Sequence, residues 1–368
     1  MTKQAFIQEL SSALNPMDSK FRNELLSDIS EHFIEGVNQG LSEEEICRNL
    51  GQPSSIAEQA LEEYKINAHQ TQKSYKTYTS YETYKDEKSH STKNNNNVDI
   101  DKTFSNINDI DIEMSHCNIR LVPMPQSNDI RVVLQGKTRH NNFTIKDQGG
   151  KLIVHQHTPL IQFVFRFWMS NPSLEATIYI PHNFLGNIKA STSLGTISAQ
   201  GISGNLKANN AGGCIIVEDY KGNEIKLVSS AGNVKLIVSD SAAPTVKMHS
   251  SAGKVTIEAA ETKKVKLESS AGNVIANIKK IDGDAKVYST AGSVSLTAVE
   301  VYGNISVTST AGKVKINMPK DINCQIKAKK PSAGKLINEL TGNPDSPYKL
   351  HANSTAGSVI LSALQMDN

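Results

Sequence analysis

The chain of 368 residues carries 39 Lys and Arg against 37 Asp and Glu, a net charge of +2 at neutral pH. This balance, with few aromatic residues, argues against a nucleic-acid-binding protein, whose binding surface is strongly basic. No run of about eighteen apolar residues suggests a transmembrane helix, and the first ten residues lack the apolar core of a secretion signal. We therefore expect a cytoplasmic protein and leave membrane association open.

The charge is distributed unevenly along the chain. Residues 1–66 hold 5 Lys and Arg against 12 Asp and Glu, a net charge of −7. Residues 181–368 hold 21 against 14, a net charge of +7. Such segregation suggests either that the two parts attract each other or that the acidic part faces a basic partner.

Residues 1–66 are predicted to form a small helical bundle. Apolar residues recur at helical spacing in two runs, which are Phe6, Leu10 and Leu14, then Leu25, Ile29 and Phe33. Ser42 and Glu45 form a capping box that opens a third helix, with Ile46 directed inward. Pro53 is suited to the first position of a fourth helix.

Four motifs of this segment resemble the HAAS family, a cytoplasmic domain of bacterial and mostly Gram-positive signalling and membrane-associated proteins. They are Phe6-Ile7-x-x-Leu10, Glu31-His32-Phe33-x-Glu35-Gly36, Gly40-Leu41-Ser42-Glu43-Glu44 and Leu50-Gly51-x-Pro53-x-x-Ile56-Ala57. The resemblance implies a regulatory or partner-binding domain without catalytic activity. His32 stands alone on its helix, so we expect it to pack or cap rather than to bind a metal.

Residues 67–97 are predicted to be a disordered linker, because Lys, Ser, Thr and Tyr dominate and an asparagine run ends the segment. Tyrosines recur there at every third residue, at Tyr75, Tyr78, Tyr81 and Tyr84. Two interpretations remain open for these tyrosines: low-complexity disorder, or a segment that docks on a partner.

Residues 98–185 contain short alternating runs such as Ile119 to Leu121, and we predict strands that begin and cap a solenoid. An unusual aromatic patch lies within this segment, at Phe163, Phe165, Phe167 and Trp168. We consider two roles for the patch: a cap strand that packs on the first coil, or an exposed hairpin that contacts a membrane or partner.

We expect no metal, cofactor or redox site. His155 and His157 share one face of a predicted strand, but no third ligand accompanies them. The four cysteines lack metal-binding or redox spacing, and they are Cys47, Cys117, Cys214 and Cys324.

Residues 186–368 repeat the phrase Ser-Ser/Thr-Ala-Gly-x-Val. Its corner glycines lie about twenty residues apart, at Gly232, Gly253, Gly272, Gly292, Gly312 and Gly357, with looser copies at Gly195, Gly212 and Gly334. Apolar residues alternate with polar ones around each glycine, which is typical of a half-buried strand. A fixed period of this length predicts a parallel β-helix, or solenoid, with about twenty residues per coil.

The geometry of each corner restricts which residue types fit there. Glycine is expected either because the corner needs a positive φ or because no Cβ fits, and the preceding alanine is expected to face inward. One serine per coil is also predicted to point inward and to bond the same hydroxyl of the next coil: Ser229, Ser250, Ser269, Ser289, Ser309 and Ser354. No histidine or acid recurs beside these serines, so we assign them a structural role.

Lysines occupy one outward position in four successive coils, six residues before the glycine: Lys226, Lys247, Lys266 and Lys286. Two interpretations remain open. The column is a solvated face that prevents sheet association, or it is a stripe that binds an anionic polymer or a lipid headgroup.

From residue 98 onward the chain resembles a β-solenoid family of proposed adhesins. A helical HAAS-type segment joined to this solenoid resembles the Gram-positive cell-envelope stress proteins of the LiaX type. The resemblance implies a regulatory role with a protein partner, and the second interpretation of the lysine column adds an anionic envelope polymer or a lipid as the candidate ligand.

A non-catalytic interaction or regulatory protein therefore fits best, with a surface adhesin as the alternative. A polysaccharide-acting β-helix enzyme is disfavoured, because such enzymes align carboxylates on neighbouring coils. The acidic residues of these coils occupy different positions, as in Glu258, Glu268, Asp282 and Glu300.

Overall fold

The computed structural model describes residues 1–38, 40–58, 60–61, 97–137, 143–156, 174–238 and 244–364. Two compact units are present, a helical one at the N-terminus and a β unit that begins near Asn96, and each is described by itself. The predicted linker before Asn97 and the aromatic patch Phe163, Phe165, Phe167 and Trp168 lie outside the described residues.

The helical unit follows the sequence prediction. Its helices are α1 (Lys3–Ala13), α2 (Ser19–Asn38) and α3 (Glu43–Leu50), and residues 53–58 and 60–61 are also helical. Phe6, Ile29 and Phe33 are buried in one core, where the rings of Phe6 and Phe33 meet edge to face at 5.7 Å. The capping box is confirmed, because the Glu45 amide donates to Ser42 Oγ while the Ser42 amide donates to Glu45 Oε2.

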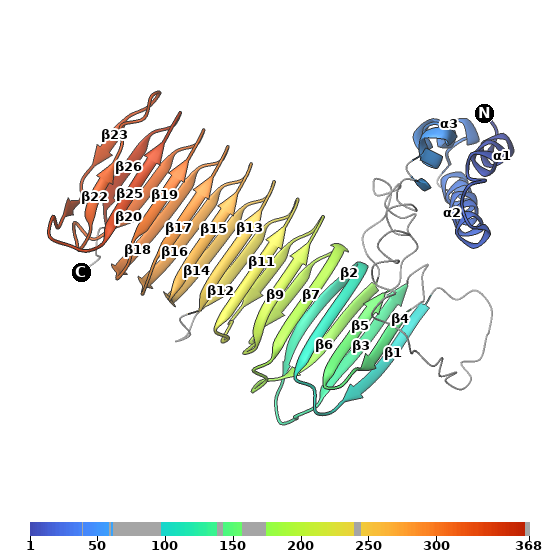
Figure 1. The fold of residues 1–368 in the computed structure, drawn as a ribbon, viewed down its shortest axis with the longest axis horizontal. Helices are drawn as coiled ribbons and strands as arrows, with labels where there is room; N and C mark the ends of the chain where they lie inside the picture. Colours follow the sequence, from blue (N-terminus) through green and yellow to red (C-terminus); the bar gives the residue numbers. More distant parts are fainter. Residues whose placement is uncertain are drawn as a thin grey trace. The chain divides into compact units, whose positions relative to one another are not determined.

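The β unit is a parallel solenoid, as predicted (Figure 1). Each regular coil contributes one strand to each of two sheets, and apolar side chains from both sheets form one continuous core. Sheet 1 contains β7 (Asn187–Leu194), β9 (Asn205–Asn210), β11 (Glu224–Ser229), β13 (Thr245–Ser250), β15 (Lys264–Ser269), β17 (Ala285–Ser289) and β19 (Ile305–Ser309). Sheet 2 contains β8 (Ile197–Gln200), β10 (Ile215–Glu218), β12 (Val234–Val238), β14 (Val255–Thr262), β16 (Val274–Ile281), β18 (Val294–Val301) and β20 (Val314–Met318).

The coils stack without slipping in register. In sheet 1, Leu227 pairs with Met248, which in turn pairs with Leu267 and then Val287. All four side chains are buried, so a shift by one residue would turn the apolar set to solvent. Every side-chain position therefore forms a column that runs along the solenoid axis.

Crowding, and not backbone conformation, explains the corner glycines. A Cβ on Gly253 would lie 2.1 Å from the carbonyl oxygen of Gly232, and one on Gly272 would lie 2.1 Å from that of Gly253. Among the corner glycines of the described chain, only Gly195 has a positive φ, of 119°. The prediction for the preceding alanine was wrong, since Ala231 and its equivalents are exposed.

The repeated serines are buried as predicted, but their predicted partners were wrong. The hydroxyl of Ser269 donates to the carbonyl of Gly253 in the preceding coil at 3.0 Å. The same oxygen accepts the amide of Gly272, three residues ahead, at 2.9 Å. Equivalent pairs of bonds hold Ser229, Ser250, Ser289, Ser309 and Ser354. The hydroxyls therefore bond glycine backbone instead of one another.

At the N-terminal end, chain order and spatial order differ. The long strand β2 (Asp109–Met124) passes from sheet 1 into sheet 2, and it lies between the coil of β5 (Lys151–Gln156) and β6 (Leu174–Pro181) and the coil of β7 and β8. Antiparallel strands follow outside: β1 (Asn97–Phe104), β3 (Ile130–Lys137) and β4 (Phe143–Asp147).

The C-terminal end shows a second exchange of order. The last coil in sequence contains β25 (Lys349–Ser354) and β26 (Val359–Ala363), and these strands pair with β19 and β20. The preceding coil, with β22 (Gln325–Ala328) and β23 (Leu336–Asn338), lies outermost. A two-residue pairing of β21 (Asp321–Ile322) with β24 (Thr341–Gly342) accompanies it.

Candidate binding surface

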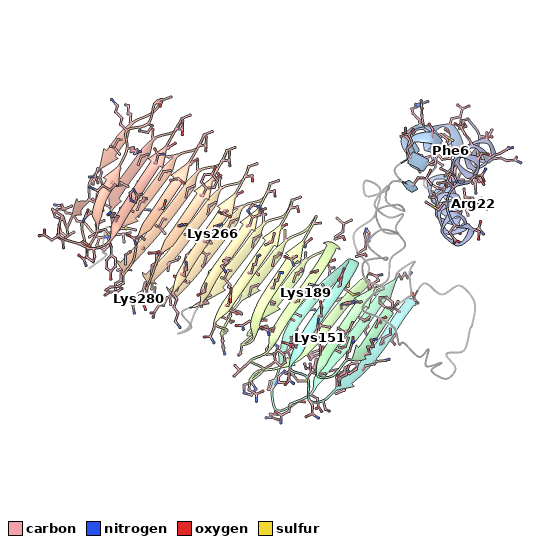
Figure 2. The ribbon with its side chains drawn as sticks, viewed as in Figure 1. Phe6, Arg22, Lys151, Lys189, Lys266 and Lys280 are labelled. Carbon is pink, nitrogen blue, oxygen red and sulfur yellow. The ribbon has the colours of Figure 1, made fainter. Side chains whose placement is uncertain are left out.

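The outer face of sheet 1 carries a column of lysines. As predicted, Lys226, Lys247, Lys266 and Lys286 are exposed, and each pairs in register with the next. The column is longer than expected, because Lys207 pairs with both Lys189 and Lys226. Lys189 and Lys266 mark two of its positions in Figure 2. We call Lys189, Lys207, Lys226, Lys247, Lys266 and Lys286 the lysine column.

The two added lysines follow the same spacing rule. Lys189 stands six residues before Gly195, and Lys207 stands six residues before Gly213. The repeated phrase predicts the corner of that coil at Gly212, whereas the structure places it one residue later, at Gly213. A count from Gly213 would have found Lys207.

Among the described residues, three of the six column lysines have no carboxylate partner. Lys247 Nζ lies 3.3 Å from Glu224, and Lys266 Nζ lies 2.8 Å from Glu268. Within the described residues, Lys207, Lys226 and Lys286 have no carboxylate oxygen within 4.0 Å. The side chains of Lys247 and Lys266 are about half exposed, at 48% and 51%, so even their ion pairs are weak and exchangeable.

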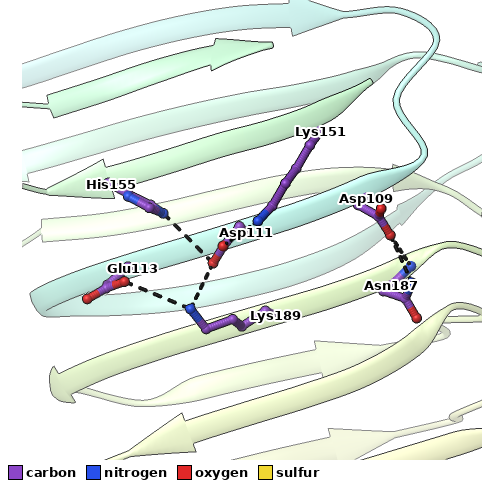
Figure 3. A network of polar contacts seen from close by, with 7 residues as sticks. All are labelled: Asp109, Asp111, Glu113, Lys151, His155, Asn187 and Lys189. Atoms are coloured by element: carbon purple, nitrogen blue, oxygen red, sulfur yellow. Dashed lines mark hydrogen bonds and ion pairs between the residues drawn. The ribbon is translucent and has the colours of Figure 1, made fainter. Parts of the chain in front are cut away.

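A polar network closes the N-terminal end of the column (Figure 3). Asp111 of β2 pairs in register with Lys189, and its carboxylate is nearly buried. Lys151 Nζ of β5 donates to Asp111 Oδ2 at 2.8 Å. Lys189 Nζ lies 3.2 Å from Asp111 Oδ1 and 3.9 Å from Glu113. His155 Nε2 lies 3.8 Å from Asp111 Oδ1. Asp111 Oδ1 accepts no well-aligned hydrogen bond among the described residues.

The network favours the charged form of Asp111. Burial alone would raise the pKa of this carboxyl, but hydrogen bonds and charge from Lys151 and Lys189 outweigh burial and hold it below its usual value. Asp111 is therefore an anion at neutral pH, and it neutralises the first lysine of the column.

The opposite end of the column carries no such network. Ser306 follows Lys286 in register, and His351 follows Ser306. At the corner beside the column stand exposed hydroxyl residues, which are Ser230, Ser251, Ser270, Thr290, Thr310 and Thr355. These residues are neutral and add no charge beside the column.

Sheet 2 has no equivalent column. Its corresponding outward positions, taken coil by coil, are Ile216, Lys235, Thr256, Ile275, Ser295 and Lys315. The same solenoid thus carries a continuous row of cations on one face and a mixed row on the other.

Metal binding and thiol chemistry find no support in the described part of the chain. No group of three or more His, Cys, Asp or Glu residues there is arranged to hold a metal ion. His157 lies outside the described residues, and His155 contacts Asp111 instead. Burial raises the pKa of the Cys117 and Cys324 thiols, which disfavours a reactive thiolate. In the same part of the chain, no helix has the length and apolarity required to cross a bilayer.

These features define a repeat protein with an extended charged surface. Residues 107–360 match the Toastrack DUF4097 family model, which covers well over half of the chain, and the protein belongs to this family. Residues 5–59 match the HAAS family model, in agreement with the motifs of the helical unit. No curated protein matches the chain.

Several solved structures are similar to the solenoid. A proposed adhesin from Parabacteroides merdae is 13% identical with a TM-score of 0.36, and the match covers 74% of this chain and 98% of that one. A proposed adhesin from Bacteroides fragilis is 13% identical with a TM-score of 0.32, covering 72% and 97%. A proposed lipid-binding protein from Parabacteroides distasonis is 14% identical with a TM-score of 0.30, covering 74% and 98%. Such low TM-scores support no further argument.

Proposed function

We propose that the protein is a non-catalytic binding protein of the bacterial cell envelope, whose lysine column binds an anionic component of that envelope. The observation that carries this proposal is the register of the column: six cations occupy one position in six successive coils. Ammonium groups stacked roughly 5 Å apart repel one another, and a bound anion would relieve this repulsion.

The helical unit is proposed to bind a protein partner and to connect the solenoid to envelope-stress regulation. Support comes from the HAAS match and from the net charge of −7 over residues 1–66. An acidic domain favours a partner with a basic surface, because complementary charge speeds association and excludes wrong partners.

The binding part of the proposal is tested by cosedimentation with vesicles that contain about 30% phosphatidylglycerol, and with purified anionic wall polymer. The variant replaces Lys226, Lys247, Lys266 and Lys286 with glutamate, and we expect it to lose binding of both. A control variant makes the same change at four lysines outside the sheet 1 strands, Lys235, Lys254, Lys279 and Lys315. If both variants bind like the unaltered protein, the column does not bind anions.

The regulatory part is tested in cells. We expect membrane association of the protein to rise after treatment with a cell-wall antibiotic, and to be lost when residues 1–66 are deleted. Crosslinking and pull-down with the intact chain would then identify the protein partner. A distribution that ignores both the antibiotic and the deletion would contradict this part and leave the anion-binding part standing.

A further inference from the structure

We infer that the lysine column aligns one linear polyanion, a phosphodiester or phosphoanhydride chain, along the solenoid axis, and that Asp111 ends this site at its N-terminal side. The inference rests on the proposed anion binding and narrows it to one ligand class. It depends on three features: the shape of the charged region, the free lysines and the polar network.

The positive charge follows a line, not a plane. Six lysines in successive coils span five steps of about 4.8 Å, or roughly 24 Å along the axis. The neighbouring outward column, two residues before each of these lysines, is mixed, because it carries Glu224, Thr245, Lys264 and Asp284. A flat lipid surface would press its anionic headgroups against these carboxylates, whereas a single extended chain follows the lysines alone.

The lysine column is accessible to a ligand between Lys207 and Lys286. Lys207, Lys226 and Lys286 form no ion pair among the described residues. The Lys247 and Lys266 ammonium groups pair with exposed or half-buried carboxylates, and phosphate oxygens can displace these. A chain of phosphates therefore meets one available ammonium group in each coil.

The polar network sets the N-terminal limit of the line. Asp111 and Glu113 lie beside Lys189 in space, and Lys151 and His155 of β5 face the same carboxylate. Beyond Lys189 a polyanion would meet two carboxylates, and the Lys151 ammonium group is already bonded to Asp111. Removal of one carboxylate should extend the site past Lys189.

The experiment measures binding of the full chain to inorganic polyphosphates of defined length by fluorescence anisotropy at fixed ionic strength. We expect affinity to rise with chain length until the chain spans the column, and then to level off. Lys207→Glu combined with Lys226→Glu and Lys286→Glu should weaken binding by about tenfold or more. The matched control, Lys235→Glu with Lys279→Glu and Lys315→Glu on sheet 2, should stay within about twofold.

The limit of the site is tested by Asp111→Asn, which should strengthen binding of long chains by about twofold to fivefold and leave short ones unchanged. Glu113→Gln provides a second test, because the Glu113 side chain is 61% exposed and its loss spares the Asp111 contacts. Unchanged binding of long chains in both variants would overturn this assignment.

Vesicle binding separates the two levels of the proposal. If anionic vesicles bind through the column but polyphosphate affinity does not depend on length, the linear-polyanion inference fails and the proposed anion binding survives. If neither ligand distinguishes the column variant from its control, the proposed binding function itself fails.

Discussion

At each solenoid corner, one small polar side chain satisfies two backbone groups that belong to different coils. Serine does so in six coils, and Asn210 does so one coil before Ser229: its amide donates to the carbonyl of Gly195, and its oxygen accepts the amides of Gly212 and Gly213. Unpaired, these buried groups would destabilise the corner. The recurring serine is therefore required by the backbone, which explains why it repeats without a catalytic partner.

Replacement of Ser269 by alanine tests this role. The change leaves the amide of Gly272 and the carbonyl of Gly253 without their partner, so we expect a loss of about 1–3 kcal/mol in the free energy of unfolding. Chemical denaturation followed by circular dichroism measures the change. The adjacent Ser270 is exposed, and its replacement by alanine should alter stability by less than about 0.5 kcal/mol. Equal effects at the two sites would contradict the assigned role.

The Asp111 network makes stability depend on acidity. The pKa of Asp111 is lower in the folded protein than in the unfolded chain. The ionised carboxylate therefore adds to the free energy of unfolding in full above the ordinary carboxyl pKa of about 3.9, and this stabilisation is lost as the pH falls through the pKa of the folded protein. We expect Asp111→Asn to lower stability at neutral pH by about 1–3 kcal/mol. Denaturation midpoints measured from pH 7 down to pH 3 should converge for the variant and the unaltered protein.

Asp345→Asn is the matched control for that experiment. Asp345 is exposed, and among the described residues its carboxylate forms no ion pair. Its replacement should leave the denaturation midpoint nearly unchanged across the pH range. If the denaturation midpoints of Asp111→Asn and the unaltered protein differed by the same amount at every pH, an ionic role for Asp111 would be excluded.

Among the elements, the exchanged order of the last two coils decides which corner carbonyl lacks a serine donor. Three residues before Gly334 stands Pro331, which has no hydroxyl, whereas Ser354 stands three residues before Gly357. Ser354 donates to the carbonyl of Gly312 at 2.8 Å. Stacked directly on β19 and β20, the coil of Pro331 would leave this carbonyl without its donor. In the observed order the missing serine bond falls at the carbonyl of Gly357, at the last step of the stack, and the step from Gly312 keeps its donor.

A truncated chain tests this order. A stop after Gly342 removes β25 and β26, which separates β19 and β20 from β22 and β23. We expect amide hydrogen-exchange protection to be lost in β22 and β23 and reduced in β19. A chain that ends after Leu364 is the control and should exchange like the full protein. If β22 retained its protection in the shorter chain, β22 would stack directly on β19 without a serine donor, and the order of the coils would not depend on Ser354.

Local regularity decided what could be predicted from the sequence. Alternation around Leu227 and Lys226 predicted the strands, the buried serines and the exposed lysines, because each coil repeats one environment. Serine partners were predicted incorrectly, since the corner turns the serine toward the glycine backbone of two coils. Coil order at both ends and the contact of Asp111 with Lys151 depend on pairing between distant segments, which periodicity does not encode.

For the whole molecule, the charge distribution predicts strong dependence of binding on salt. Exposed charges are screened over about 10 Å at 0.1 M salt and over about 3 Å at 1 M. We expect binding of vesicles or polyphosphate to weaken by at least about tenfold between 0.05 and 0.5 M NaCl. The variant with Lys207→Glu, Lys226→Glu and Lys286→Glu should show a much smaller salt effect. Binding that resists salt would indicate an apolar contact instead.

The serine–glycine bonds also make the length of this protein adjustable. Each coil satisfies its own corner and bonds one carbonyl of the coil before it, so an added coil of about twenty residues needs no change elsewhere. An inserted coil that carries a lysine at the column position would lengthen the lysine column by about 4.8 Å and add one cation. The number of coils would thus set the length of ligand that the column spans, and related chains with more or fewer coils would bind longer or shorter ligands of the same chemistry.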